Sequence, residues 1–130
     1  EAAILAGLSE LTNPDMIKKA AEIMGNMGSE SVLIKGGHGS GGQAQDWLFE
    51  GKRSSRFEHP WIREESGRRL SCRGTGCALS SAVAACLSLG EEMKEAVEKG
   101  IRLLQEAMLH SCQVGSGYRI LGGGFGPGNG

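Results

Sequence analysis

The stretch SCRGTGCALSSAVAACLSLG, from Ser71 to Gly90, decides how the fold is interpreted. Two glycines, Gly74 and Gly76, stand directly ahead of a long run of small and apolar residues. Glycine lets the backbone turn sharply and approach a ligand closely. The run that follows has helical spacing and ends at Gly90, and its apolar residues go nearly all round the helix, so we expect this helix to be buried.

The glycine loop ahead of this helix predicts an anion-binding site. Backbone N–H groups at Gly74, Thr75 and Gly76 can converge there, and the helix points the positive end of its dipole at the same place. Such preorganised donors suit negative charge that develops in a transition state. The alternative is a tight strand-to-helix connection that is rich in glycine for conformational reasons alone.

Cys77 falls in the first turn of the same helix, where the helix dipole favours a thiolate. It could act there as a base or a nucleophile. The alternative is a small buried hydrophobic residue, which is what we expect of Cys86 and Cys112. The two neighbouring glycines, Gly74 and Gly76, favour a role for Cys77 as base or nucleophile. The four cysteines of the chain form no CxxC pair, so neither a zinc site nor a disulfide framework is predicted.

Upstream, the sequence reads as helix, loop and strand. Asn13, Pro14 and Asp15 are typical of a helix start, and apolar residues recur at helical spacing from there to Gly28. A short buried strand, 32–34, follows and ends at Lys35. Ligands bind at the carboxyl ends of strands in α/β sheets, so a lysine there suits phosphate. The alternative is a solvated lysine at a strand end.

Further along, the sequence predicts a hairpin and a second helix. Trp47, Leu48 and Phe49 precede the turn signal 50–52, which indicates a β-hairpin. Residues 91–111 carry one apolar stripe among glutamates and lysines, so we expect an amphipathic helix that covers an outer face. The 22 glycines cluster in GGHGSGG, GTG and GGGFGPGNG, a distribution that suggests backbone close to a ligand.

Composition bounds the classes of function. The 130 residues fit one domain. With 14 basic and 15 acidic residues evenly mixed, the formal net charge of −1 gives no reason to expect nucleic acid or an anionic membrane as a partner. No apolar run reaches the roughly 20 residues of a membrane span, and the first residues, EAAILAGLSE, lack the basic region of a signal peptide. We therefore expect a cytoplasmic location.

Several separated segments resemble one family in the same order along the chain. That family is the hydroxymethylpyrimidine and phosphomethylpyrimidine kinases of thiamine biosynthesis, which belong to the ribokinase-like superfamily. GTGC alone is weak evidence, whereas GTGCxLSSAxAA together with a closing GxGP is specific. The segments that carry the resemblance are VLIKGGH, DWLFEG, GTGCALSSAVAACLSLG, EAVEKGIRLL and LGGGFGPGNG.

The resemblance implies transfer of a phosphoryl group from magnesium ATP to the hydroxymethyl group of the pyrimidine, and then to its monophosphate. Gly74, Thr75 and Gly76 would form the anion hole around the transferred group, and Cys77 would be the catalytic cysteine. Lys35 would lie near the nucleotide phosphates. A base matters most in the first transfer, in which an alcohol must lose a proton as it attacks.

The resemblance also implies a fold, partners and a second set of roles. The fold is α/β: three ribokinase-like α/β/α layers around a mostly parallel sheet, with an antiparallel hairpin at its edge. Such kinases are about twice as long, so residues 1–130 look like the C-terminal portion of a single domain whose N-terminal half is absent. Glu1 would help organise magnesium and phosphate. The expected partners are the pyrimidine, ATP and either a second copy in a homodimer or the missing half.

Two positions depart from the family pattern, and two other functions stay open. Arg73 stands where the family usually has histidine, and Ala78 where threonine is frequent. One alternative is a pyridoxal kinase or another ribokinase-like kinase of small molecules. The other is a non-catalytic half domain that binds phosphate, nucleotide or a partner chain, because an uncovered sheet edge seeks pairing.

Overall fold

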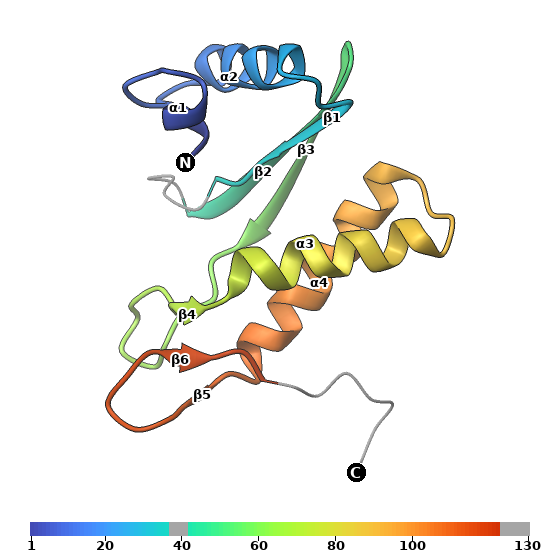
Figure 1. The fold of residues 1–130 in the computed structure, drawn as a ribbon. Coiled ribbons are helices and arrows are strands. Elements are labelled where there is room, and N and C mark those ends of the chain that lie inside the picture. Colours follow the sequence, from blue (N-terminus) through green and yellow to red (C-terminus); the bar gives the residue numbers. More distant parts are fainter. Residues whose placement is uncertain (37–41, 123–130) are drawn as a thin grey trace. The chain divides into compact units, whose positions relative to one another are not determined.

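The computed structural model describes residues 1–36 and 42–122, which fall into two compact units, Glu1–Pro60 (unit 1) and Trp61 onward (unit 2). Figure 1 shows the order of their helices and strands. The segment 37–41 of the GGHGSGG cluster and the tail from 123, with its GxGP motif, lie outside the described residues. No helix in the described ranges is both long and apolar enough to cross a bilayer.

Unit 1 begins with a short helix, α1 (Ala2–Leu5), and continues with α2 (Pro14–Asn26). The predicted start of α2 is confirmed: the Asn13 side chain accepts a hydrogen bond from the N–H of Met16 at 2.9 Å, and Pro14 occupies the first helical position. Ala20 and Ala21 of α2 are buried and pack in one core with Ala6 and Ile34. Small side chains at this contact let the helix lie close to the sheet.

The sheet of unit 1 has three strands, β1 (Ser31–Ile34), β2 (Gln43–Glu50) and β3 (Arg53–Pro60), in the order β1-β2-β3. The predicted hairpin is confirmed. Glu50 pairs with Arg53, which leaves a two-residue turn. Gly51 takes a φ of +58° in this turn, a conformation that favours glycine.

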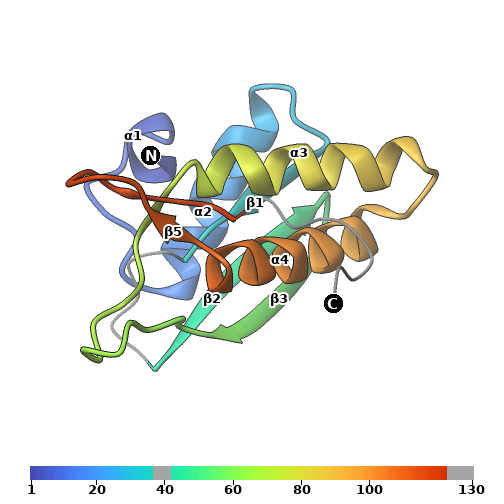
Figure 2. The ribbon, with the colours of Figure 1, turned by 90° about the horizontal axis from the view of Figure 1, so that it is seen from below.

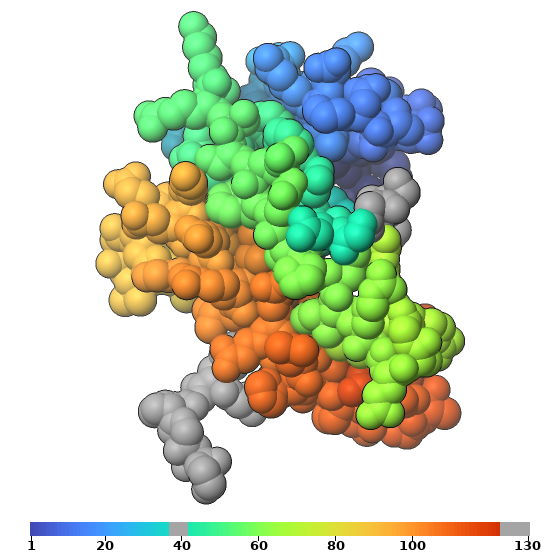
Figure 3. All heavy atoms as spheres, turned by 180° about the vertical axis from the view of Figure 1, so that it is seen from behind, coloured from blue at the N-terminus to red at the C-terminus, as the bar shows by residue number. Residues whose placement is uncertain are grey.

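Unit 2 contains β4 (Cys72–Arg73), α3 (Thr75–Ser88), α4 (Met93–Leu109), β5 (Cys112–Gln113) and β6 (Arg119–Ile120). Figure 2 shows α3 and α4 side by side. They approach closely at Gly100 of α4, where a Cβ atom would meet Val83 at 3.0 Å and Leu79 at 3.1 Å. As predicted, α4 is amphipathic: its buried residues include Val97 and Ile101, whereas charged residues such as Lys94 and Glu98 are exposed. Figure 3 shows the surface coloured along the sequence, with residues of α4 in orange.

Strand pairing differs from the mostly parallel sheet that we expected. β1, β2 and β3 all pair antiparallel, and in the described part of the chain the parallel pairing joins β4 to β6. The antiparallel pairing of β2 with β3 is that of the expected hairpin, because a two-residue turn cannot return a strand in parallel. The antiparallel pairing of β1 with β2 was not expected.

Two expectations about burial are wrong. The helix α3 was expected to be buried because its apolar residues go nearly all round it, but Leu79 and Cys86 are its buried residues, and Leu89 at its end is 81% exposed. The reason is that α3 packs against α4 along one stripe, which covers one side of a helix. Cys86 is buried as expected, whereas Cys112 is exposed in β5.

Candidate phosphate-binding site

The sharp turn predicted at the glycine loop is present between β4 and α3. Gly74 directly follows Arg73 of β4 and is the N-cap of α3, with a φ of +84°. Residues with a Cβ atom rarely adopt this left-handed conformation. A single glycine therefore turns the chain from strand to helix.

The first turn of α3 presents backbone donors that the helix itself does not use. The first backbone hydrogen bond of the helix runs from the N–H of Ala78 to the carbonyl of Gly74, at 2.9 Å. The preceding N–H groups, those of Thr75, Gly76 and Cys77, have no acceptor within the helix. Within residues 1–36 and 42–122, no side chain caps this end, and apart from the adjoining residues and the helix's own backbone nothing lies within 4 Å of the place where a Cβ of Gly74 or Gly76 would stand. An anion can therefore approach these donors.

Cys77 and the neighbouring Ser80 complete this end of the helix. Cys77 is exposed and is a free thiol, so it is accessible to a reactant. The hydroxyl of Ser80 donates to the carbonyl of Gly76 at 3.0 Å and to that of Cys77 at 3.1 Å. These bonds occupy the carbonyls of Gly76 and Cys77 and make no use of the N–H groups of the first turn.

A cation stands directly before the loop. The Cζ atom of Arg73 lies 4.3 Å from the centre of the Tyr118 ring, in the segment that joins β5 to β6. Arg119 anchors that segment, because its guanidinium donates to the carbonyl of Ser111 at 2.6 Å and to the hydroxyl of Ser111 at 3.1 Å. Arg73 thus immediately precedes the first turn of α3 in the chain, and its guanidinium stacks on the β5–β6 segment.

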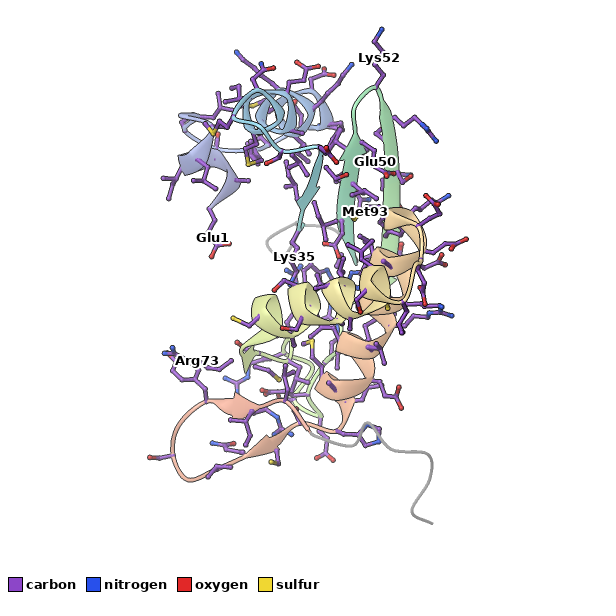
Figure 4. The ribbon with its side chains drawn as sticks, turned by 45° about the vertical axis from the view of Figure 1, so that its right-hand side comes forward. Glu1, Lys35, Glu50, Lys52, Arg73 and Met93 are labelled. Atoms are coloured by element: carbon purple, nitrogen blue, oxygen red, sulfur yellow. The ribbon has the colours of Figure 1, made fainter. Side chains whose placement is uncertain are left out.

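The other two predicted site residues belong to unit 1. Lys35 is exposed and is the first residue after β1, as predicted for a strand-end lysine. Glu1 is exposed and is the N-cap of α1. Figure 4 shows both residues at the same end of unit 1. Gly74, Thr75, Gly76 and Cys77 adjoin one another in unit 2.

Sequence reasoning missed a buried polar pair next to Lys35. Asp46 of β2 is 3% exposed, and its Oδ2 lies 3.0 Å from Nε2 of His59 in β3. Its Oδ1 accepts a hydrogen bond from the N–H of Gly36 at 2.9 Å. The sequence did carry a signal. Asp46 alternates with Ala44 and Leu48 on the buried face of β2, and a charged residue on a buried face requires hydrogen-bond partners.

The donors present suit magnesium that is bound together with a nucleotide. In residues 1–36 and 42–122, no three His, Cys, Asp or Glu side chains gather as a metal cage would require. Magnesium on a nucleotide needs one or two carboxylates, since phosphates and water supply its other ligands. Glu1 offers one exposed carboxylate of that kind.

The fold is that of the ribokinase-like α/β kinases. Pyridoxal kinase of Bacillus subtilis, solved as an ADP complex, superposes with a TM-score of 0.81 at 29% sequence identity. The match covers 93% of this chain and 44% of that chain.

Within this class, residues 1–121 match the family described as phosphomethylpyrimidine kinase. The chain belongs to that family. A hydroxymethylpyrimidine/phosphomethylpyrimidine kinase of Aquifex aeolicus is 36% identical over 121 residues, which are 93% of this chain and 45% of that protein. A bifunctional thiamine biosynthesis protein of Geobacter sulfurreducens is 31% identical over 118 residues, 91% of this chain and 23% of that protein. The chain therefore spans less than half the length of these relatives.

Proposed function

We propose that this chain takes part in the ATP-dependent phosphorylation of 4-amino-5-hydroxymethyl-2-methylpyrimidine and of its monophosphate, in thiamine biosynthesis. The observation that carries the proposal is the first turn of α3, which Gly74 opens and in which free N–H groups adjoin the exposed thiol of Cys77. Membership of the phosphomethylpyrimidine kinase family supports the choice of acceptor.

Each residue has a distinct task in this proposal. The N–H groups of Gly74, Thr75 and Gly76 stabilise the negative charge on the phosphoryl group in transfer, and Lys35 neutralises the nucleotide phosphates. Cys77 takes the proton from the hydroxymethyl group as its oxygen attacks phosphorus. In the second transfer the acceptor is a phosphate that is already largely ionised near neutral pH, so a base has less to do.

Magnesium would neutralise charge on the transferred phosphates when it is bound with ATP. Glu1 would be the carboxylate of this chain that holds it. The pyridoxal kinase to which this chain is similar was solved with ADP, and this supports a nucleotide as the phosphoryl donor.

We further propose that the chain works as the C-terminal portion of a longer kinase domain, because it matches 45% of its Aquifex relative. A second copy or the remaining portion of the domain would then be its partner. The intact mass of the purified protein, with a search for a co-purifying chain, tests this part of the proposal.

Pyridoxal is the second candidate acceptor, because the superposed Bacillus subtilis structure is a pyridoxal kinase with 29% identity. An assay with magnesium ATP and either acceptor decides between them. Phosphorylation of the hydroxymethylpyrimidine supports the first proposal, and turnover of pyridoxal alone supports the second. Nucleotide binding without turnover of either acceptor identifies a non-catalytic binding domain.

A further inference from the structure

The Asp46 carboxylate is buried at an unusual place. Asp46 lies in β2, the middle strand of the unit 1 sheet, and is 3% exposed. Ala44 and Leu48, on the same face of the strand, are 2% and 1% exposed. A buried carboxylate is costly unless hydrogen bonds compensate it. Asp46 therefore requires partners, and those partners indicate what it does.

Both carboxylate oxygens have a partner from a different part of unit 1. Oδ2 faces Nε2 of His59 in β3 at 3.0 Å, and Oδ1 accepts from the N–H of Gly36 at 2.9 Å. His59 is itself mostly covered, with 21% of its side chain exposed. The carboxylate thus joins the strand β3 to the segment that leaves β1.

The hydrogen bond from Gly36 to Asp46 links the chain after β1 to β2 beyond the last backbone pair of these two strands. The β1–β2 ladder ends at the pair Ile34 and Trp47. Two residues later, a side chain of β2 holds the N–H of Gly36 in place of a backbone carbonyl. A Cβ atom on Gly36 would collide with the backbone carbonyl of Gln45, so glycine is required at this close approach. Gly36 is therefore restrained by its N–H and by its Cα.

Lys35 lies between the end of the ladder and this restraint. Its backbone is bounded by Ile34, paired with Trp47, and by Gly36, held by Asp46. The two fixed neighbours set the direction in which Lys35 leaves the strand. An ammonium group on a flexible stem gains from such restraint, because less freedom is lost when it binds a phosphate.

We propose that Asp46 is a positioning residue that orients Lys35 toward the nucleotide phosphates by holding the N–H of Gly36, with His59 securing the carboxylate. This inference rests on the proposed function, which gives Lys35 its phosphate. Asp46 acts through the backbone and does not itself touch the nucleotide.

A double-mutant cycle between Lys35 and Asp46 tests the inference. The dissociation constant of AMP-PCP is measured by calorimetry on the full chain for the wild type, Lys35→Ala, Asp46→Ala and the double variant. If Asp46 acts through Lys35, Asp46→Ala weakens binding about tenfold alone and less than about twofold in the Lys35→Ala background. Equal losses in both backgrounds overturn the inference.

Two further variants keep the test decisive. Asp46→Asn keeps an oxygen for the N–H of Gly36, so we expect it to restore most of the affinity that Asp46→Ala loses. If Asp46→Ala does not fold, the cycle is run with Asp46→Asn, and a loss in Asp46→Asn that persists undiminished in the Lys35→Ala background overturns the inference. Gln45→Ala is the matched control, because Gln45 is exposed on the same strand and bonds Glu58 at 3.2 Å on the outer face.

The Gly36 amide gives a readout independent of binding. We expect its hydrogen exchange to accelerate at least about tenfold in Asp46→Ala and to stay unchanged in Gln45→Ala. Unchanged exchange in Asp46→Ala overturns the inference. If the wild type binds no AMP-PCP, the proposed function fails and the positioning role falls with it. If the wild type does bind AMP-PCP but the affinity losses of Asp46→Ala and Lys35→Ala are additive, only the positioning role of Asp46 fails.

Discussion

Arg73 stacks on Tyr118, with its guanidinium carbon 4.3 Å from the centre of the ring. The pair links the strand before the glycine loop to the β5–β6 segment of unit 2. A cation over an exposed aromatic ring is worth about 0.5–1 kcal/mol. We predict that Tyr118→Leu lowers the free energy of unfolding by about this amount and that Arg73→Leu adds little to the loss. Chemical denaturation of the two single variants and the double variant measures the coupling.

Tyr118→Phe is the matched control for that cycle, because it keeps the ring and removes the hydroxyl. It should leave the free energy of unfolding within about 0.5 kcal/mol of the wild type. A Tyr118→Phe variant as unstable as Tyr118→Leu would show that the hydroxyl, and not the stacked ring, supplies the stabilisation.

Cys77→Ala should slow the first phosphoryl transfer more than the second. Loss of a general base typically costs about 10²–10⁴-fold in rate, and only the first acceptor is an alcohol that must lose a proton. Single-turnover rates with the hydroxymethylpyrimidine and with its monophosphate measure the two steps. Cys112→Ser, at another exposed cysteine, should leave both rates unchanged. Equal losses in both transfers for Cys77→Ala would contradict a role as base.

Two helical glycines should respond oppositely to alanine. At Gly25 of α2 a Cβ meets nothing within 4 Å, so Gly25→Ala should stabilise the protein by about 0.5–1 kcal/mol through helix propensity. At Gly100 a Cβ meets Val83 at 3.0 Å and Leu79 at 3.1 Å, so overpacking, typically about 1–3 kcal/mol, should outweigh the same gain. Thermal unfolding of both variants compares them. If Gly100→Ala stabilised the protein as much as Gly25→Ala, the side chains of Val83 and Leu79 in α3 would have to move aside at little energetic cost.

Gly36→Ala should be far more damaging than Gly42→Ala. A Cβ at Gly36 would run into the carbonyl of Gln45, and backbone cannot move aside as a side chain can. We expect a loss of at least about 3 kcal/mol in the free energy of unfolding. Gly42 follows the segment 37–41, and no atom of the described residues beyond its chain neighbours lies within 4 Å of a Cβ there, so alanine should change stability by less than about 0.5 kcal/mol. Urea titration of both variants measures the contrast.

Stability at alkaline pH should depend on Lys99. Its ammonium donates to Glu91 at 2.6 Å, and this hydrogen bond raises the pKa of Lys99 above its ordinary value of 10.5. A raised pKa in the folded state stabilises the protein fully below that ordinary value, and the stabilisation is lost as pH rises through the folded pKa. The difference in stability between the wild type and Lys99→Gln should therefore shrink at strongly alkaline pH. Lys94→Gln, on the exposed face of the same helix, should show a smaller and flatter difference.

Local signals in the sequence predicted the elements and their ends. Asn13 caps α2 because its side chain bonds an N–H three residues ahead, and Gly74 opens α3 because it alone tolerates the backbone angle needed there. The turn at Gly51 predicted the hairpin for the same reason. These signals lie within a few residues of their effects, so a single chain read in order reveals them.

Sequence reasoning failed where the answer depended on a distant partner. The apolar residues nearly all round α3 suggested a buried helix, but a helix is buried only where another element covers it, and α4 covers one stripe. The hairpin at Gly51 was expected to be antiparallel, but the antiparallel pairing of β1 with β2 was not, because it joins residues far apart along the chain, such as Val32 and Phe49, beyond the reach of any short turn signal.

The sequence by itself determined the helices, the hairpin, the glycine loop with Cys77 and the family to which they belong, because these depend on short-range geometry and on motif order. Only the tertiary structure decided that Asp46 holds Gly36 beside Lys35, that His59 secures Asp46 and that Arg73 stacks on Tyr118. These partners are 10 to 45 residues apart, the extremes being the Gly36–Asp46 and Arg73–Tyr118 pairs. Contacts over such separations exist only once the strand register and the chain path bring the side chains together.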